Sequence, residues 1–174
     1  RRASFRGALG VARPDIDAGE RGGGTGDRLA RCHGLLDKLL EVRPGSGYAA
    51  AVMSRIASEV VAMERQHDLV EIARTRLRRL GYGNVKIVEG DGTGGCPGEA
   101  PFDAILAAAS GSHVPEPLVD QLAPGGRLVM PIGDPGWVQE LVKLIKRPDG
   151  TTEQKNLGGV RFVPLIGEEG WRDG

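Results

Sequence analysis

From Leu35 onward, short apolar runs alternate along the chain with segments whose apolar residues recur at helical spacing. The apolar runs predict strands at Lys38–Val42, Glu59–Glu64, Asn84–Glu89, Phe102–Ala107, Gly126–Pro131, Val138–Ile145 and Val160–Val163. The periodic segments predict helices at Tyr48–Ala57, His67–Leu80 and Pro115–Leu122. Because strands that alternate with helices form parallel sheets covered on both faces, we expect an α/β, doubly wound and mainly parallel sheet.

The last two predicted strands break this alternation, because no helical pattern separates them. The segment Val138–Lys146 is followed by Pro148-Asp149-Gly150, which is a turn signal, and then by Val160–Val163. This order predicts an antiparallel pair at the edge of the sheet near the C-terminus.

The first 34 residues differ in composition from the rest of the chain. They are rich in Arg and Gly, show no clear apolar period, and contain the run Gly19–Gly26. Such a segment can bury little apolar surface, so we expect residues 1–34 to be poorly structured and residues 35–174 to form one folded domain. An alternative is that the segment is a basic arm that contacts a partner.

Net charge bears on the class of partner, and cysteine content bears on metal binding and cellular location. Lys and Arg together number 23, as do Asp and Glu, so the zero net charge does not favour binding to nucleic acid or to a membrane surface. No apolar run approaches the ~20 residues of a membrane span. Cys32 and Cys96 lie far apart without metal-type spacing, which predicts free thiols, no metal site and a cytoplasmic location.

The segment LLEVRPGSGY, residues 39–48, carries the clearest functional signal. It consists of an apolar strand ending in Glu41, a turn containing Gly45 and Gly47, and the start of a helix. Glycines let the backbone approach a ligand, and a helix N-terminus offers free N–H donors, so this pattern indicates a nucleotide-cofactor pocket. Glu64 ends the second strand about 20 residues later, the spacing of a ribose-binding carboxylate.

Two further strand ends carry polar groups where ligands of parallel sheets bind. Gly90-Asp91-Gly92-Thr93 follows the third strand, and Ala107-Ala108-Ala109-Ser110 follows the fourth. Asp91 could accept a hydrogen bond from an exocyclic amine, or it could cap its own turn, just as Glu64 could be a solvated acid. Ala50 replaces the third glycine of a dinucleotide fingerprint, which favours an adenosine ligand without pyrophosphate.

This arrangement resembles the class I S-adenosylmethionine-dependent methyltransferases and, more narrowly, the protein-L-isoaspartate O-methyltransferase family. The resemblance extends from about Asp37 to Trp171. It is carried by LLEVRPGSGYAAAV, VVAMER, LGYGNVKIVEGDGT, APFDAILAAAS, VPEPLVDQLAPGGRLVMPIG and NLGGVRFVPLIGEEGW. The stretches LAPGGRLVMPIG and VRFVPLIGEEGW are the most specific to this family.

The resemblance implies a Rossmann-like methyltransferase fold and methyl transfer from S-adenosyl-L-methionine to the free carboxylate of L-isoaspartyl residues in damaged proteins. The product would be S-adenosyl-L-homocysteine, no metal would take part, and the enzyme would be a monomer. The cofactor-binding residues would be Glu41, Gly45, Ser46, Gly47, Glu64, Asp91, Gly92 and Thr93. The substrate-binding residues would be Ala108, Val160, Arg161, Phe162 and Val163. A carboxylate with a pKa near ~4 is already ionised at neutral pH, so no general base is required and no catalytic residue is assigned.

The sequence departs from the family pattern in two places. Arg43 stands where the family loop has its first glycine, and left-handed geometry there would cost roughly 1–2 kcal/mol. A guanidinium ~5 Å from a sulfonium would add about 3 kcal/mol of repulsion unless the side chain turns outward. Residues 1–36 contain no match to the family's Gln-Thr-Ile-Ser-like motif. These departures leave open the alternative of a non-catalytic relative that binds cofactor weakly, or that binds only a protein partner.

Overall fold

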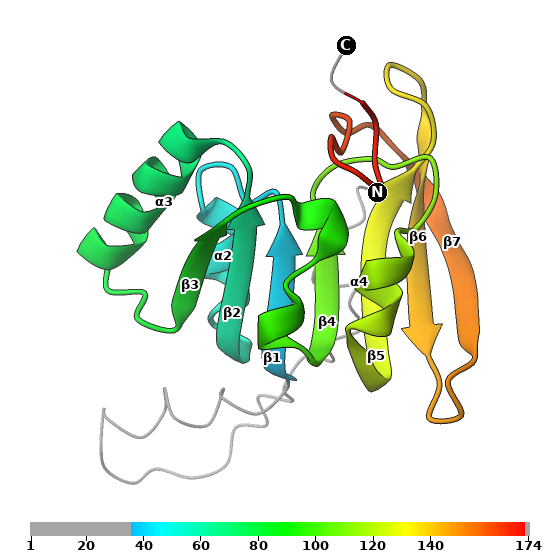
Figure 1. Cartoon of the computed structure of the whole chain (residues 1–174), viewed down its shortest axis with the longest axis horizontal. Helices are drawn as coiled ribbons and strands as arrows, with labels where there is room; N and C mark the ends of the chain where they lie inside the picture. The colour runs from blue at the N-terminus through cyan, green and yellow to red at the C-terminus, as the bar shows by residue number, and fades with distance from the viewer. Residues whose placement is uncertain (1–35, 173–174) are drawn as a thin grey trace, which may run out of the picture.

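The computed structural model describes residues 36–172 as an α/β domain built on one sheet (Figure 1). The predicted segment 1–34 lies outside the described residues. The elements in chain order are β1 (Leu36–Val42), α2 (Tyr48–Met53), β2 (Ala57–Glu64), α3 (His67–Arg79), β3 (Val85–Glu89), β4 (Phe102–Ala107), α4 (Glu116–Asp120), β5 (Leu122–Ile132), β6 (Gln139–Lys146) and β7 (Thr152–Val160). Two short 3₁₀ turns, η2 (Gly92–Gly94) and η3 (Pro97–Glu99), connect β3 to β4.

The sheet has the strand order β3-β2-β1-β4-β5-β6-β7. The pairs from β3 to β5 are parallel, whereas β5 pairs with β6, and β6 with β7, in antiparallel fashion. The order reverses at β1, since β2 and β3 extend to one side of it and β4 to the other. The prediction of a doubly wound, mainly parallel sheet with an antiparallel edge is confirmed.

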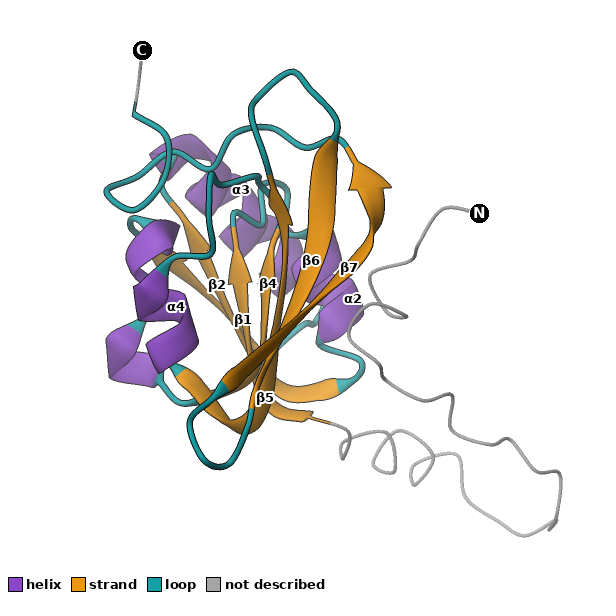
Figure 2. Ribbon diagram, turned by 90° about the vertical axis from the view of Figure 1, so that its right-hand side faces the viewer, coloured by secondary structure: helices purple, strands orange, loops and turns teal. Residues whose placement is uncertain are grey.

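The helices cover both faces of this sheet (Figure 2). Helices α2 and α3 pack on one face through Ala50, Met53 and Leu77, and α4 packs on the other through Leu118. Successive residues of β1 therefore face two different cores: Leu39 lies on the α2 side and Leu40 on the α4 side. A strand buried on both faces has no polar alternation, which is why the central strands read as apolar runs.

The structure corrects the last predicted strand. Instead of Val160–Val163, β7 spans Thr152–Val160 and pairs with β6 from Lys146↔Thr152 to Gln139↔Val160. Most of its side chains are exposed and polar, as suits an edge strand. Such a strand has no apolar period, so the hydrophobic pattern pointed to the apolar residues that follow it.

Smaller differences concern the ends of several elements, most clearly α2 and β5. Helix α2 stops at Met53, short of the predicted Ala57, and Ile56 already belongs to the turn before β2. Strand β5 starts at Leu122 rather than Gly126, with a register shift against β4. Among residues 36–172, no helix is long and apolar enough to cross a membrane.

Candidate active site

The glycine turn connects β1 to α2 at the carboxyl edge of the sheet. The Arg43 N–H donates to the Met63 carbonyl over 2.9 Å, and the Gly47 N–H donates to the Pro44 carbonyl over 3.0 Å. Gly45 and Gly47 have positive φ values of 54° and 78°. A Cβ on Gly47 would also lie 3.3 Å from Ala73 and Leu77 of α3, so glycine allows this turn to pack closely on the helix.

Glu64 joins this turn to the end of β2. Its side chain is only 2% exposed, and it accepts hydrogen bonds from the backbone N–H groups of Gly45 (3.2 Å), Arg65 (3.0 Å) and Gln66 (3.1 Å). Three backbone donors satisfy a buried carboxylate well. The alternative of a solvated acid at the strand end is therefore wrong. The carboxylate lies against the glycine turn, as a ribose-binding role requires.

Glu41 lies on β1 between Ala62 of β2 and Leu106 of β4, and it is completely buried. Neither carboxylate oxygen has a hydrogen-bond partner among the described residues. Burial, and secondarily the charge of Glu64, raise the pKa of Glu41 to about 8. A buried acceptor that the protein leaves unsatisfied suits a site that receives a donor from a ligand.

Asp91, Gly92 and Thr93 follow β3 and form the start of η2. Asp91 accepts hydrogen bonds from the Thr93 N–H (2.9 Å), the Thr93 hydroxyl (2.8 Å) and the Glu168 N–H (2.8 Å). Burial acts to raise the pKa of Asp91, but these hydrogen bonds outweigh it and hold the pKa below its usual value. Asp91 is thus a turn cap, as the alternative interpretation expected. Its contact with a cofactor stays a prediction.

A C-terminal strap, which we define as Val163–Trp171, lies beside these loops. The Ser110 N–H donates to the Val163 carbonyl over 2.8 Å, and the Leu165 N–H donates to the Ser110 carbonyl over 2.8 Å. The indole N–H of Trp171 also donates to the Ser110 carbonyl, over 2.9 Å. The loop after β4 therefore anchors the strap, a role of Ser110 that the sequence did not reveal.

Arg43 contacts this strap directly. Its φ of 66° is the only positive value at a non-glycine residue among residues 36–172, so the expected left-handed geometry is confirmed. Its Nη1 donates to the Pro164 carbonyl over 2.5 Å. The cavity between the loops and the strap is only about 20 Å³ and is lined by Val42, Arg43, Met63, Glu64, Arg65, Gly92, Leu165 and Ile166.

That volume sets a condition on ligand binding. Sites for small molecules typically measure about 300–1,000 Å³, so this small cavity by itself does not hold an adenosine cofactor. A larger cavity of about 990 Å³ also borders the turn, at Ser46, Gly47 and Leu106. The polar groups themselves suit such a ligand, since they combine the backbone of a glycine turn with two acceptors, the Glu64 carboxylate and the unsatisfied Glu41. In the part of the chain that the structure describes, no group of His, Cys, Asp or Glu could hold a metal ion.

The predicted substrate residues lie around the strap. Ala108 is half-buried, and its N–H donates to the Val42 carbonyl over 3.0 Å, which places it beside the glycine turn. Val160 ends β7, and the next three residues lead into the strap, with Arg161 and Val163 exposed and Phe162 half-buried.

Gln139 holds the segment around Phe162, although no sequence pattern pointed to it. The Phe162 N–H donates to its Oε1 over 2.7 Å, and its Nε2 donates to the Phe162 carbonyl over 3.1 Å. The residue is 1% exposed although it begins an edge-proximal strand. The two hydrogen bonds fix the backbone of Phe162 next to the turn between β5 and β6.

Comparison with known proteins decides the family. The family model described as protein-L-isoaspartate(D-aspartate) O-methyltransferase matches residues 33–170. The chain belongs to this family. The protein-L-isoaspartate O-methyltransferase of Methanoculleus marisnigri is 51% identical over 136 residues, which are 78% of this chain and 61% of that protein. The relative from Pyrococcus horikoshii is 48% identical over 136 residues, covering 78% and 62% of the two chains.

Solved structures support the same assignment. A protein-L-isoaspartate O-methyltransferase superposes with a TM-score of 0.71 and 34% identity, over 77% of this chain and 43% of that one. A family member from Plasmodium falciparum, solved in complex with S-adenosyl-L-homocysteine, gives a TM-score of 0.65 and 30% identity, over 75% and 66% of the chains. The chain spans about 60% of the length of the two curated relatives named above.

Proposed function

We propose that this chain transfers a methyl group from S-adenosyl-L-methionine to the free carboxylate of L-isoaspartyl residues in damaged proteins or peptides. The observation that carries the proposal is the Gly45–Glu64 hydrogen bond, which joins the glycine turn to a buried acid at the topological switch point of the sheet. Membership of the isoaspartyl methyltransferase family supplies the reaction class.

Residues from three strand ends, those of β1, β2 and β3, would hold the cofactor. Gly45, Ser46 and Gly47 would present the backbone of the turn, and Glu64 would accept hydrogen bonds from the ribose hydroxyls. Glu41 would lie behind the turn, and Asp91, Gly92 and Thr93 would line the adenine end. When bound, S-adenosyl-L-methionine supplies an electrophilic methyl group on a sulfonium, and S-adenosyl-L-homocysteine is the product.

The protein's task is to place the substrate carboxylate and to exclude water. Ala108 and the segment from Val160 to Val163 would line the groove for the isoaspartyl peptide, with Gln139 fixing the backbone at Phe162. Because the attacking carboxylate is ionised at neutral pH, no side chain has to remove a proton. The rate would come from alignment in a shielded site. We assign no catalytic residue.

A second candidate function is favoured by Arg43. Its left-handed backbone and its hydrogen bond to Pro164 close the space between the turn and the strap to about 20 Å³. A relative that has kept the fold but binds the cofactor weakly, or binds only a protein partner, would show this arrangement.

We further propose that the protein acts as a monomer in the cytoplasm on isoaspartyl-containing proteins. Support for a reducing compartment comes from Cys96, which is a buried free thiol. Sedimentation or light scattering of the purified chain at micromolar concentration would give the mass. A mass twice that of the chain would contradict the monomer.

Two measurements test the function. Calorimetric titration with S-adenosyl-L-homocysteine should show micromolar binding, and labelled S-adenosyl-L-methionine should methylate an isoaspartyl peptide but not the same peptide with normal aspartate. Glu64→Gln should weaken binding at least roughly tenfold, since it removes the charged ribose acceptor. The exposed Glu71, on α3, offers a matched control as Glu71→Gln. Absence of binding at millimolar ligand would favour the second candidate.

A further inference from the structure

Glu41 is the most deeply buried ionisable group near the glycine turn, and the hydrogen bonds of the described residues leave it without a partner. Its neighbours in the sheet are Ala62 and Leu106, which offer no donor from their side chains. Glu64, which is equally enclosed at 2% exposure, is the charged group that acts on it. Two carboxyl groups therefore share one dry region, and only one of them has hydrogen-bond donors.

Three charged groups near the glycine turn and the end of β3 have hydrogen-bond partners other than Glu41. Helix α2, which covers the strand, carries no charged residue between Tyr48 and Met53. Arg76 of α3 reaches the turn but donates to the Ser46 carbonyl over 3.0 Å, and Arg43 donates to Pro164. Asp91 at the end of β3 is held by Thr93 and Glu168.

We propose that Glu41 carries a proton in the cofactor-free protein and releases it to solvent when the cationic cofactor binds. The inference rests on the proposed function, because S-adenosyl-L-methionine supplies the positive charge. The balance is simple: a neutral carboxylic acid becomes a carboxylate, one proton goes to the buffer, and the carboxylate faces a cation of the ligand. Glu41 would thus sense the charge of the ligand.

Electrostatics explains why Glu41 would be protonated without the ligand and ionised with it. A carboxylate without donors in an apolar region is strongly disfavoured, and a second carboxylate nearby disfavours it further. These two causes raise the pKa of Glu41 to about 8. An adjacent ammonium or sulfonium reverses the preference, so the cofactor complex binds fewer protons than the free protein. Affinity must then rise with pH, by up to about tenfold per unit below pH 8, until the α-amino group of the ligand itself begins to lose its proton.

Proton release can be counted directly by calorimetry. Titrations of the full chain with S-adenosyl-L-homocysteine and with S-adenosyl-L-methionine at pH 7, in two buffers of different ionisation enthalpy, give the number of protons exchanged. We expect net proton release at pH 7 and no release from Glu41 at pH 9.5, where its carboxyl group is already ionised in the free protein. Release with both ligands identifies the ammonium as the partner of Glu41, and release with the methyl donor alone identifies the sulfonium.

Glu41→Gln keeps the shape of the side chain but cannot ionise, so the proton release should vanish. Glu153→Gln, on the exposed face of β7, is the matched control and should release as many protons as the unmodified protein. Carboxyl ¹³C chemical shifts of the unmodified, ligand-free protein provide a measurement that does not depend on a variant that folds. One glutamate should titrate near pH 8, and its signal should be absent from Glu41→Gln.

The outcomes separate this inference from the proposed function. Tight binding without proton exchange would overturn the role of Glu41 and leave the methyltransferase proposal standing. A Glu41 signal that titrates in the ordinary range of a carboxyl group would do the same. If neither ligand binds at millimolar concentration, both proposals fail.

Discussion

The guanidinium of Arg43 donates a hydrogen bond to the carbonyl of Pro164, which lies 121 positions further along the chain. This contact ties the end of β1 to the C-terminal strap, at the position where the resemblance to the family led us to expect a glycine. The side chain does not turn outward but lies against the strap. The backbone nevertheless keeps the left-handed conformation at φ 66°.

Replacing Arg43 should separate backbone strain from side-chain effects. Arg43→Gly and Arg43→Ala both remove the guanidinium and enlarge the cavity, so both should bind S-adenosyl-L-homocysteine roughly tenfold more tightly than the unmodified protein. Only glycine relieves the left-handed backbone, so Arg43→Gly should be about 1–2 kcal/mol more stable than Arg43→Ala. Urea unfolding and calorimetry measure the two effects. Unchanged affinity in both variants would show that Arg43 does not restrict the site.

Gly92 should tolerate no side chain. A Cβ at this position would lie 2.5 Å from Cγ1 of Val42, and both residues are buried. We expect Gly92→Ala to lower the free energy of unfolding by about 1–3 kcal/mol, the usual cost of overpacking. Gly94, two residues further in η2, is exposed, and a Cβ added there would meet nothing within 4 Å, so Gly94→Ala should be neutral or slightly stabilising. Equal stability of the two variants in urea would contradict the close contact.

Gln139 should act on substrate binding through Phe162. Gln139→Ala removes both hydrogen bonds to the Phe162 backbone. Leaving a buried polar group without its partner typically costs about 1–3 kcal/mol of stability. We expect the KM for an isoaspartyl peptide to rise while the affinity for S-adenosyl-L-homocysteine stays within about twofold. Gln154→Ala on exposed β7 serves as the control. A cofactor affinity that falls together with the peptide KM effect would indicate general loosening instead.

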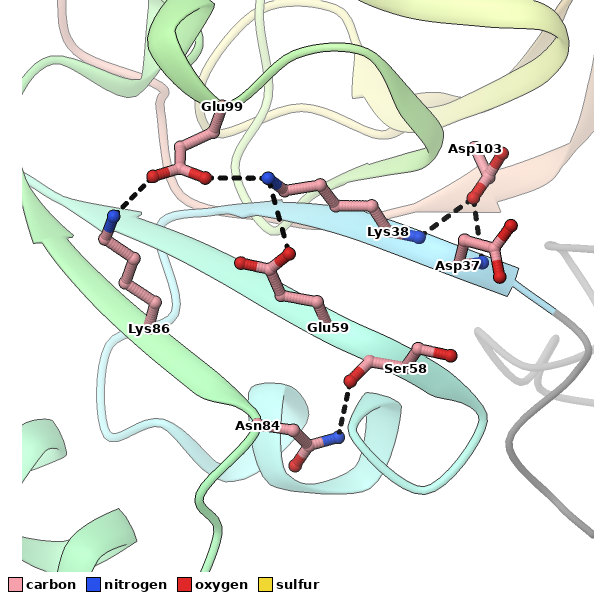
Figure 3. A network of polar contacts seen from close by, with 8 residues as sticks. All are labelled: Asp37, Lys38, Ser58, Glu59, Asn84, Lys86, Glu99 and Asp103. Atoms are coloured by element: carbon pink, nitrogen blue, oxygen red, sulfur yellow. Dashed lines mark hydrogen bonds and ion pairs between the residues drawn. The ribbon is translucent and has the colours of Figure 1, made fainter. Parts of the chain in front are cut away.

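Glu99 holds η3 against the sheet through two lysines. Its carboxylate accepts a hydrogen bond from Lys38 over 2.7 Å and one from Lys86, while Lys38 also pairs with Glu59 over 3.3 Å (Figure 3). The hydrogen bond from Lys38, and to a smaller extent the one from Lys86, lowers the pKa of Glu99 from 4.5 to about 2. A lowered pKa means that the folded state binds its proton less readily than the unfolded state.

The stabilisation by Glu99 should therefore be complete above about pH 5 and disappear as the pH falls toward 2. Thermal unfolding between pH 2 and pH 6 should show Glu99→Gln less stable than the unmodified protein at the upper end and equal to it at the lower end. Glu153→Gln, which removes an exposed pair with Arg147, should show no such pH window. A difference that does not depend on pH would mean that the charge of Glu99 contributes nothing.

The sequence by itself determined the central strands, their mainly parallel arrangement and the location of the turn and Glu64. Strands β1, β2 and β4 are buried on both faces, so each reads as an apolar run, and a glycine turn after such a run is a local signal. Tertiary structure alone decided the bounds of β7, the position of Arg43 on the strap, the hydrogen bond from the Glu168 N–H to Asp91 and the lack of a partner for Glu41. Hydrophobic periodicity reports only whether a residue is buried. Three features depend instead on which distant segments the fold brings together: an exposed edge strand, a hydrogen bond between residues 77 positions apart and a carboxyl group without donors.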